Sequence, residues 1–166
     1  MKVIKILVVM FLILGAMNVS IAQAEEKIGY VDLSILFDEY HKTKAYDKTL
    51  EVKQNEYEAQ KNEKIEKLRE SQGKLALLKE DKKAELEAQI EQMQAALIEF
   101  DRQEKTTLTK ERNEKIREIL LEIEKIVRDY AEKQGYSIIL NDRVLIYGQE
   151  SHNLTEKVLG ILNTRK

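Results

Sequence analysis

The chain contains 166 residues, with 28 Lys and Arg side chains, 30 Asp and Glu side chains, and neither Cys nor Pro. The lack of cysteine excludes a disulfide scaffold and a thiolate metal site, and the near balance of charge excludes the basic footprint of a nucleic-acid-binding domain. Charged residues form 35% of the chain, against about 25% in typical globular domains. Because these charges follow helical spacing instead of forming blocks, they indicate an elongated helical protein with little core.

Residues 1–24 predict a secretory signal peptide. Two lysines flank the start, an apolar run covers residues 6–16, and Ala22 and Ala24 place small side chains at the positions that signal peptidase reads. An uncleaved membrane anchor would need about 18–20 apolar residues, which is more than this run supplies. We therefore predict export and cleavage after Ala24, which removes two of the 28 basic side chains and leaves a formal charge of −4.

The exported part of the chain opens with a predicted strand at residues 27–33 and a short amphipathic helix at residues 34–39. Two long antiparallel helices are predicted to follow, because the next ninety or so residues are dense in Glu, Lys, Gln, Ala and Leu, which are good helix formers. The charged segment 80–83 predicts the turn between them, with Asp81 as the N-cap of the second helix. Gly73 is the alternative turn site.

An apolar stripe on each predicted helix would join the two into one arm, residues 46–115, with its tip near residues 79–83. In the second helix the stripe follows heptad spacing, and in the first it is thinner and less regular. These side chains would pack between the helices or, where the arm is partly open, offer apolar contact to another chain. The candidate seam or contact residues are Tyr57, Leu68, Leu75, Leu78, Leu86, Ile90, Met93, Leu97 and Phe100.

The second helix has a broader apolar face between residues 116 and 130, which predicts burial of its base against a larger body. Residues 136–140 and 143–147 predict two strands of a hairpin. A last helix is predicted to begin at Asn153, with Glu156 three residues further on in the pattern of a capping box.

The predicted body, residues 25–45 and 116–166, has three short strands and two small helices. Elements of this size bury too little surface to be stable alone. We therefore predict that the body associates with further copies, by sheet extension or by packing of the apolar helix base. The candidate oligomerisation residues are Ile28, Tyr30, Ile119, Ile123, Ile126, Ile138, Leu140 and Leu145.

The sequence contains no motif that indicates catalysis. The chain lacks the glycine-rich ATP-binding loop, the H-E-x-x-H zinc motif and the G-x-S-x-G nucleophile elbow. Its two imidazoles, His41 and His152, lie far apart in the sequence. We therefore predict no catalytic site, no metal and no cofactor.

Five segments in this order and spacing resemble the Skp/OmpH family of periplasmic chaperones. They are KIGYVD at residues 27–32, LF at 36–37, QGYSIIL at 134–140, VLIYG at 144–148 and NLTEKVL at 153–159. The resemblance implies a predominantly α protein of the α+β class, in which a long antiparallel helical hairpin stands on a small β-rich trimerisation body. It also implies a periplasmic homotrimer that holds unfolded outer-membrane β-barrel proteins between its arms and prevents their aggregation without ATP.

The charge of the chain departs from the basic character of the best-known family member. Residues 60–83 hold eight basic and five acidic side chains, a mild excess near the tip, but the exported chain as a whole is acidic. We therefore do not assign a lipopolysaccharide site of the family to this chain, and its charge does not support membrane contact. A function from a different class remains open at this point: a structural coiled-coil spacer or envelope adaptor whose arm is fully paired and whose partner is a folded protein.

Overall fold

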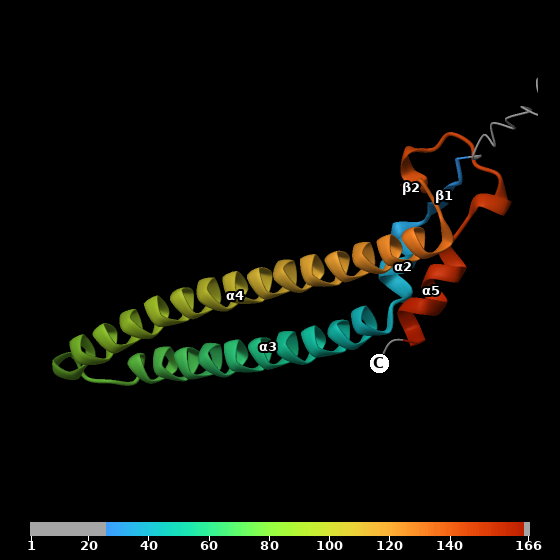
Figure 1. Cartoon of the computed structure of the whole chain (residues 1–166). Helices are drawn as coiled ribbons and strands as arrows, with labels where there is room; N and C mark the ends of the chain where they lie inside the picture. Colours follow the sequence, from blue (N-terminus) through green and yellow to red (C-terminus); the bar gives the residue numbers. More distant parts are fainter. Residues whose placement is uncertain (1–25, 165–166) are drawn as a thin grey trace, which may run out of the picture.

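The computed structural model describes residues 26–164, which form a long helical hairpin projecting from a small body (Figure 1). In chain order the elements are β1 (Ile28–Val31), α2 (Leu33–Glu39), α3 (His41–Leu75), α4 (Glu80–Gln134), β2 (Ile138–Asn141), the 3-10 turns η1 (Asp142–Val144) and η2 (Glu150–His152), and α5 (Thr155–Thr164). The predicted class, a predominantly helical α+β fold with a helical hairpin on a small body, is confirmed. The predicted signal peptide, residues 1–24, lies outside the described residues.

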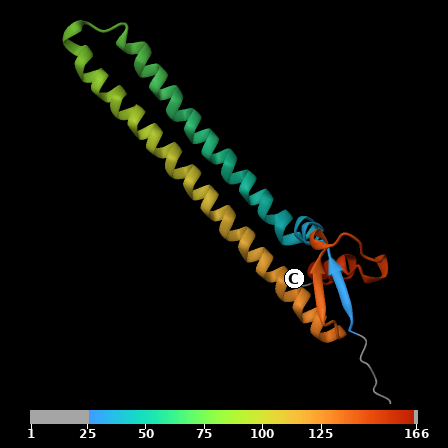
Figure 2. The same cartoon turned by 90° about the horizontal axis from the view of Figure 1, so that it is seen from above.

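The arm consists of α3, with 35 residues, and α4, with 55 residues, which corresponds to about 50 and 80 Å at ~1.5 Å per residue. The two helices leave the body side by side (Figure 2). Helix α4 ends because Gly135 adopts a left-handed conformation with φ of 72°, and its N–H donates to the carbonyl of Ala131. A side chain would be strained at this backbone angle, so glycine is the suitable residue for the cap.

The turn at the arm tip comes slightly earlier than predicted, at residues 76–79, and Glu80 already begins α4. Lys79, and not Asp81, occupies the N-cap position, with no hydrogen bond from its side chain. The reason is that Glu80 and Asp81 place negative charge in the first turn of a helix, where the helix dipole favours it. The alternative turn site, Gly73, lies within α3.

The sheet of the described residues has two strands, β1 and β2, which run parallel with Ile28 opposite Ile138. The predicted third strand at residues 143–147, and its hairpin with β2, are wrong. The chain turns at η1 instead, where the Leu145 N–H donates to the Asp142 carbonyl at 2.9 Å. The 3-10 turn at Asp142–Val144 takes the chain out of the extended conformation that a strand requires. On its other side, β1 bonds the segment after η2, through a 2.8 Å contact from the Leu154 N–H to the Tyr30 carbonyl.

The core lies where the base of α4 meets α2 and α5, and it contains Val31, Leu36, Tyr40, Ile119, Ile123, Ile126, Leu154, Val158 and Leu162. Asp32 caps α2, because its carboxylate accepts from the Ser34 N–H at 2.8 Å and the Ile35 N–H at 3.0 Å. Helix α5 begins at Thr155, two residues later than predicted, and the Asn153 side chain accepts from the Thr155 N–H at 3.1 Å, as an N-cap does. Gly29 permits the close approach of β1, since a Cβ there would lie 2.4 Å from Leu154 Cδ1.

Candidate functional site

The half of the arm nearest the body is held by ion pairs between its two helices. Lys42 Nζ lies 2.5 Å from a carboxylate oxygen of Glu122, and this contact lowers the pKa of Glu122 and raises that of Lys42. Further out, Lys53 pairs with Glu111. Pairs at this degree of exposure contribute only about 0–1 kcal/mol each, so their main effect is to fix the register of α3 against α4.

Near the middle of the arm, a group that we call the mid-arm cluster joins the two helices more tightly: Tyr57, Lys61, Phe100, Asp101 and Lys105. The Tyr57 hydroxyl donates to Asp101 at 2.5 Å, and the Tyr57 and Phe100 rings stack with centroids 6.1 Å apart. Asp101 also accepts from Lys105 at 2.8 Å and lies 2.5 Å from Lys61 Nζ. The hydrogen bonds from Lys105, Lys61 and Tyr57, in that order, hold the pKa of Asp101 well below its usual range.

The half of the arm beyond this cluster is packed more sparsely. Ile90 is buried there, while the other predicted seam residues of this half, Leu68, Leu75, Leu78, Leu86, Met93 and Leu97, are half-buried. Among the described residues, the hydrogen bonds and ion pairs between the two helices in this half reduce to one weak contact, from Ser71 Oγ to Met93 Sδ at 3.7 Å. Few buried apolar contacts and exposed backbone lower the free energy of local opening. The tip side of the arm is therefore the part that can separate most easily.

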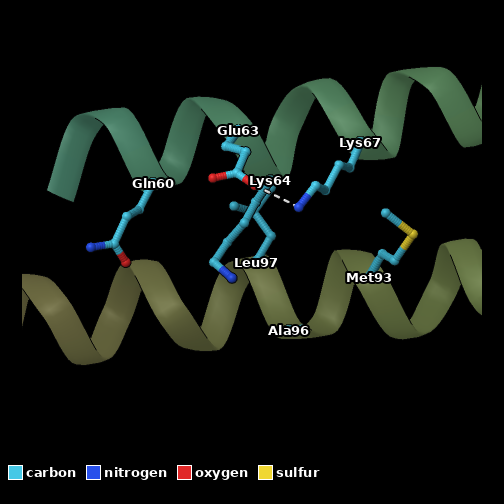
Figure 3. A pocket seen from close by; sticks show the side chains of 7 residues that line it. All are labelled: Gln60, Glu63, Lys64, Lys67, Met93, Ala96 and Leu97. Carbon is cyan, nitrogen blue, oxygen red and sulfur yellow. Dashed lines mark hydrogen bonds and ion pairs between the residues drawn. The ribbon is translucent and has the colours of Figure 1, made fainter. Parts of the chain in front are cut away.

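A hollow of about 240 Å³, which we call the arm groove, opens between the helices beside the mid-arm cluster. Its lining residues are Gln60, Glu63, Lys64 and Lys67 of α3 and Met93, Ala96 and Leu97 of α4. The Met93 and Leu97 side chains point from α4 toward α3, and the Glu63–Lys67 ion pair lies along the opposite wall (Figure 3). The groove thus has one apolar wall and one polar wall.

The structure separates the predicted oligomerisation residues into two groups. Ile119, Ile123 and Ile126 fill the core of their own chain, so they are not free to meet a second copy. Ile28 and Ile138 are exposed, and Tyr30, Leu140 and Leu145 are half-buried.

Sequence reasoning missed the most exposed apolar residues of the body. Val144, Ile146 and Tyr147 stand out into solvent because residues 143–147 do not pair in the sheet. Nearby, two hollows border Leu33 and Asn141, and the Asn141 side-chain oxygen is buried there without a hydrogen-bond partner. The continuous apolar run over 144–147 was the available signal, and it was interpreted as a strand pairing within the chain.

Comparison with known proteins places the chain in a family. The family described as outer membrane protein (OmpH-like) matches residues 27–162. The chain belongs to the OmpH-like family. This OmpH-like chain is 30% identical over 156 residues to the chaperone protein Skp of Vibrio cholerae, covering 87% of this chain and 88% of that protein. It is 26% identical over 148 residues to the chaperone protein Skp of Pectobacterium atrosepticum, covering 82% and 86% of the two chains.

Among solved structures, an OmpH-like protein from Caulobacter crescentus superposes with a TM-score of 0.79 at 13% identity, over 86% of this chain and 87% of that one. This likeness supports the fold. Both curated relatives are named as chaperones. Within residues 26–164, no helix of this OmpH-like chain has an apolar stretch long enough to cross a membrane.

Proposed function

We propose that this OmpH-like protein is an ATP-independent holding chaperone of the periplasm, which binds unfolded outer-membrane β-barrel proteins between its arms and prevents their aggregation. The observation that carries the proposal is the long arm, with a firmly joined inner half and a sparsely packed outer half. The Skp relatives support the same assignment. The predicted signal peptide would direct the chain to the compartment where such clients, meaning unfolded substrate chains, emerge.

The arm suits weak and unspecific binding. A client exposes apolar segments along its whole length, so several shallow contacts on a long surface serve it better than one deep pocket. Burial of apolar area contributes about 25 cal/mol per Å², and many small contacts together can offset the loss of chain entropy on binding. Enclosure between arms would also keep one client from meeting another.

The cavity between arms requires more than one copy, and we propose a homotrimer assembled through the body, residues 25–45 and 116–166. The number three comes from the family resemblance. Exposed Val144, Ile146 and Tyr147 support self-association of this region, because neighbouring apolar side chains exposed on a surface mark sites at which proteins associate. The thin core of the body supports it as well.

The proposal is tested by diluting a urea-unfolded outer-membrane β-barrel protein into buffer that contains the purified mature chain and no ATP. Light scattering should stay low at a small molar excess of trimer and rise in the presence of an unrelated folded protein at the same concentration. Equal scattering in the two samples at a several-fold excess would refute the holding activity. Sequencing the N-terminus of the exported protein tests cleavage after Ala24.

A further inference from the structure

Beside the mid-arm cluster, the side chains with which α3 and α4 face each other differ in polarity. From α4, Met93 and Leu97 present apolar side chains toward α3 (Figure 3). From α3, the residues that face them across the arm groove are polar: Gln60, Lys64 and Lys67. The groove is therefore apolar on the side that α4 contributes and polar on the side that α3 contributes.

The arm groove is large enough for a guest side chain because Ala96 contributes only a methyl group to its rim. Its volume of about 240 Å³ equals the share of several water molecules, at ~30 Å³ each in the liquid. Releasing such water from beside Met93 and Leu97 favours an apolar guest. The groove opens to solvent along the side of the hairpin, so a guest can enter without separating α3 from α4.

The charges around the groove favour a particular kind of guest. Lys67 is neutralised by Glu63, with 2.5 Å between Nζ and the carboxylate. Lys64 makes no ion pair within the described part of the chain, and its ammonium lies 4.9 Å from the centroid of the Phe100 ring. An ammonium group without a carboxylate partner, beside the apolar wall of the groove, attracts the face of an aromatic ring more strongly than it attracts an aliphatic side chain.

We propose that the arm groove takes up aromatic side chains of the client. The inference rests on the proposed function and specifies the chemistry of one contact site. Outer-membrane β-barrels carry girdles of aromatic residues at both membrane interfaces, and an unfolded barrel protein exposes these rings. Met93, Ala96 and Leu97 supply the apolar wall for the ring, and Lys64 supplies the cation at its face.

The test uses two substitutions that differ only in where they add bulk. Ala96→Leu fills the groove, while Ala95→Leu adds the same atoms about 100° around the helix axis, at an exposed position that does not line the groove. The probe is a dye-labelled eight-stranded outer-membrane barrel protein, diluted from urea, together with a version whose girdle aromatics are replaced by leucine. Affinity is measured by fluorescence anisotropy with the full trimeric protein, and circular dichroism checks that both variants are folded.

We expect Ala96→Leu to weaken binding of the aromatic client by about two- to five-fold, the range that one exposed cation–π contact supplies. Binding of the leucine client should change by less than two-fold, and Ala95→Leu should leave both affinities unchanged. Equal losses for both clients, or equal effects of the two substitutions, would overturn the groove as an aromatic site while leaving the holding activity intact. A changed molecular mass of Ala96→Leu would instead assign the groove to a second copy of the chain. If the unsubstituted protein binds neither client, both the proposed holding function and the proposed aromatic site are refuted.

A charge substitution gives a second, independent readout. Lys64→Met keeps a long apolar side chain and removes the ammonium, so it should lower the ratio of affinities for the aromatic and leucine clients by about two-fold. Lys48→Met, on the exposed face of α3, makes the same change in net charge away from the groove. The proposal is wrong if both substitutions lower the ratio equally or if neither changes it.

Discussion

At the scale of single residues, Asp101 is the side chain that joins α3 and α4 at the centre of the arm, so it should contribute to the stability of the arm. Its carboxylate receives the Tyr57 hydroxyl and the ammonium groups of Lys61 and Lys105. Asp101→Asn keeps an acceptor oxygen for Tyr57 but loses both charge contacts, so we expect a lower melting temperature at pH 7. Asp47→Asn, which removes an exposed carboxylate from the same arm, is the matched control and should change little.

The difference between Asp101→Asn and the unsubstituted protein should depend on pH. The pKa of Asp101 lies below its ordinary value of 3.8 in the folded protein, so the stabilisation is fully present above that value and is lost as the pH falls toward the folded pKa. We therefore expect the two melting temperatures to converge as the pH is lowered from about 4 to 2. A constant difference over this interval would show that the charge of Asp101 does not stabilise the arm.

Ile123 illustrates a different role, because it is fully buried between α4, α2 and α5. Ile123→Ala should lower the free energy of unfolding by about 2–5 kcal/mol, the usual cost of such a cavity. Leu121, two residues away on the same helix, is 55% exposed, and Leu121→Ala should cost less than about 0.5 kcal/mol. Urea denaturation at one fixed protein concentration compares the two. Similar costs would mean that Ile123 is not part of the core.

At the scale of elements, the two halves of the arm should differ in backbone dynamics. The inner half is crossed by the Lys42–Glu122 and Lys53–Glu111 pairs and ends at the mid-arm cluster. The outer half, residues 68–93, relies on sparse apolar contacts. Hydrogen exchange followed by mass spectrometry should therefore show faster exchange for peptides from residues 68–93 than for peptides from residues 42–57. Uniform protection along the arm would favour the spacer or adaptor function over client binding.

The elements that the sequence predicted well are those specified by local pattern. Heptad spacing identified Ile90 and Phe100 on the inward face of α4, and the broad apolar face at its base identified Ile119, Ile123 and Ile126 as buried. The sequence predicted that the flanking body would cover these residues and also gave them as candidate oligomerisation residues. In the structure α2 and α5 cover them, and which of the two helices meets which face depends on the fold.

Long-range contacts could not be predicted from the sequence, because they also depend on how the elements are arranged in the fold. The contact of Tyr57 with Asp101 spans 44 positions, and it depends on the register that the turn imposes on α3 and α4. The strand predicted at residues 143–147 is wrong because a short apolar run indicates burial or pairing without specifying which edge it pairs with. Local pattern therefore located the apolar side chains of this region without showing what they pair with.

At the scale of the whole molecule, the exposed segment formed by Val144, Ile146 and Tyr147 makes assembly testable. The segment follows β2 directly, its apolar side chains stand in solvent, and the body behind it has a small core.

If further copies cover this segment, a charge placed in it would be buried at the interface without a partner, which is strongly unfavourable. Ile146→Asp should therefore dissociate the proposed trimer into monomers at micromolar concentration, as measured by light scattering of the purified protein. Val52→Asp, which also replaces a β-branched apolar side chain by a carboxylate, at an exposed position on α3, should keep the mass of the unsubstituted protein. Because the proposed cavity would form only between arms of different copies, dissociated Ile146→Asp should also fail to suppress client aggregation, whereas Val52→Asp should retain most of the proposed activity. An unchanged mass of Ile146→Asp would place the interface elsewhere on the body, and monomers that still suppress aggregation would show that a single arm is sufficient to hold a client.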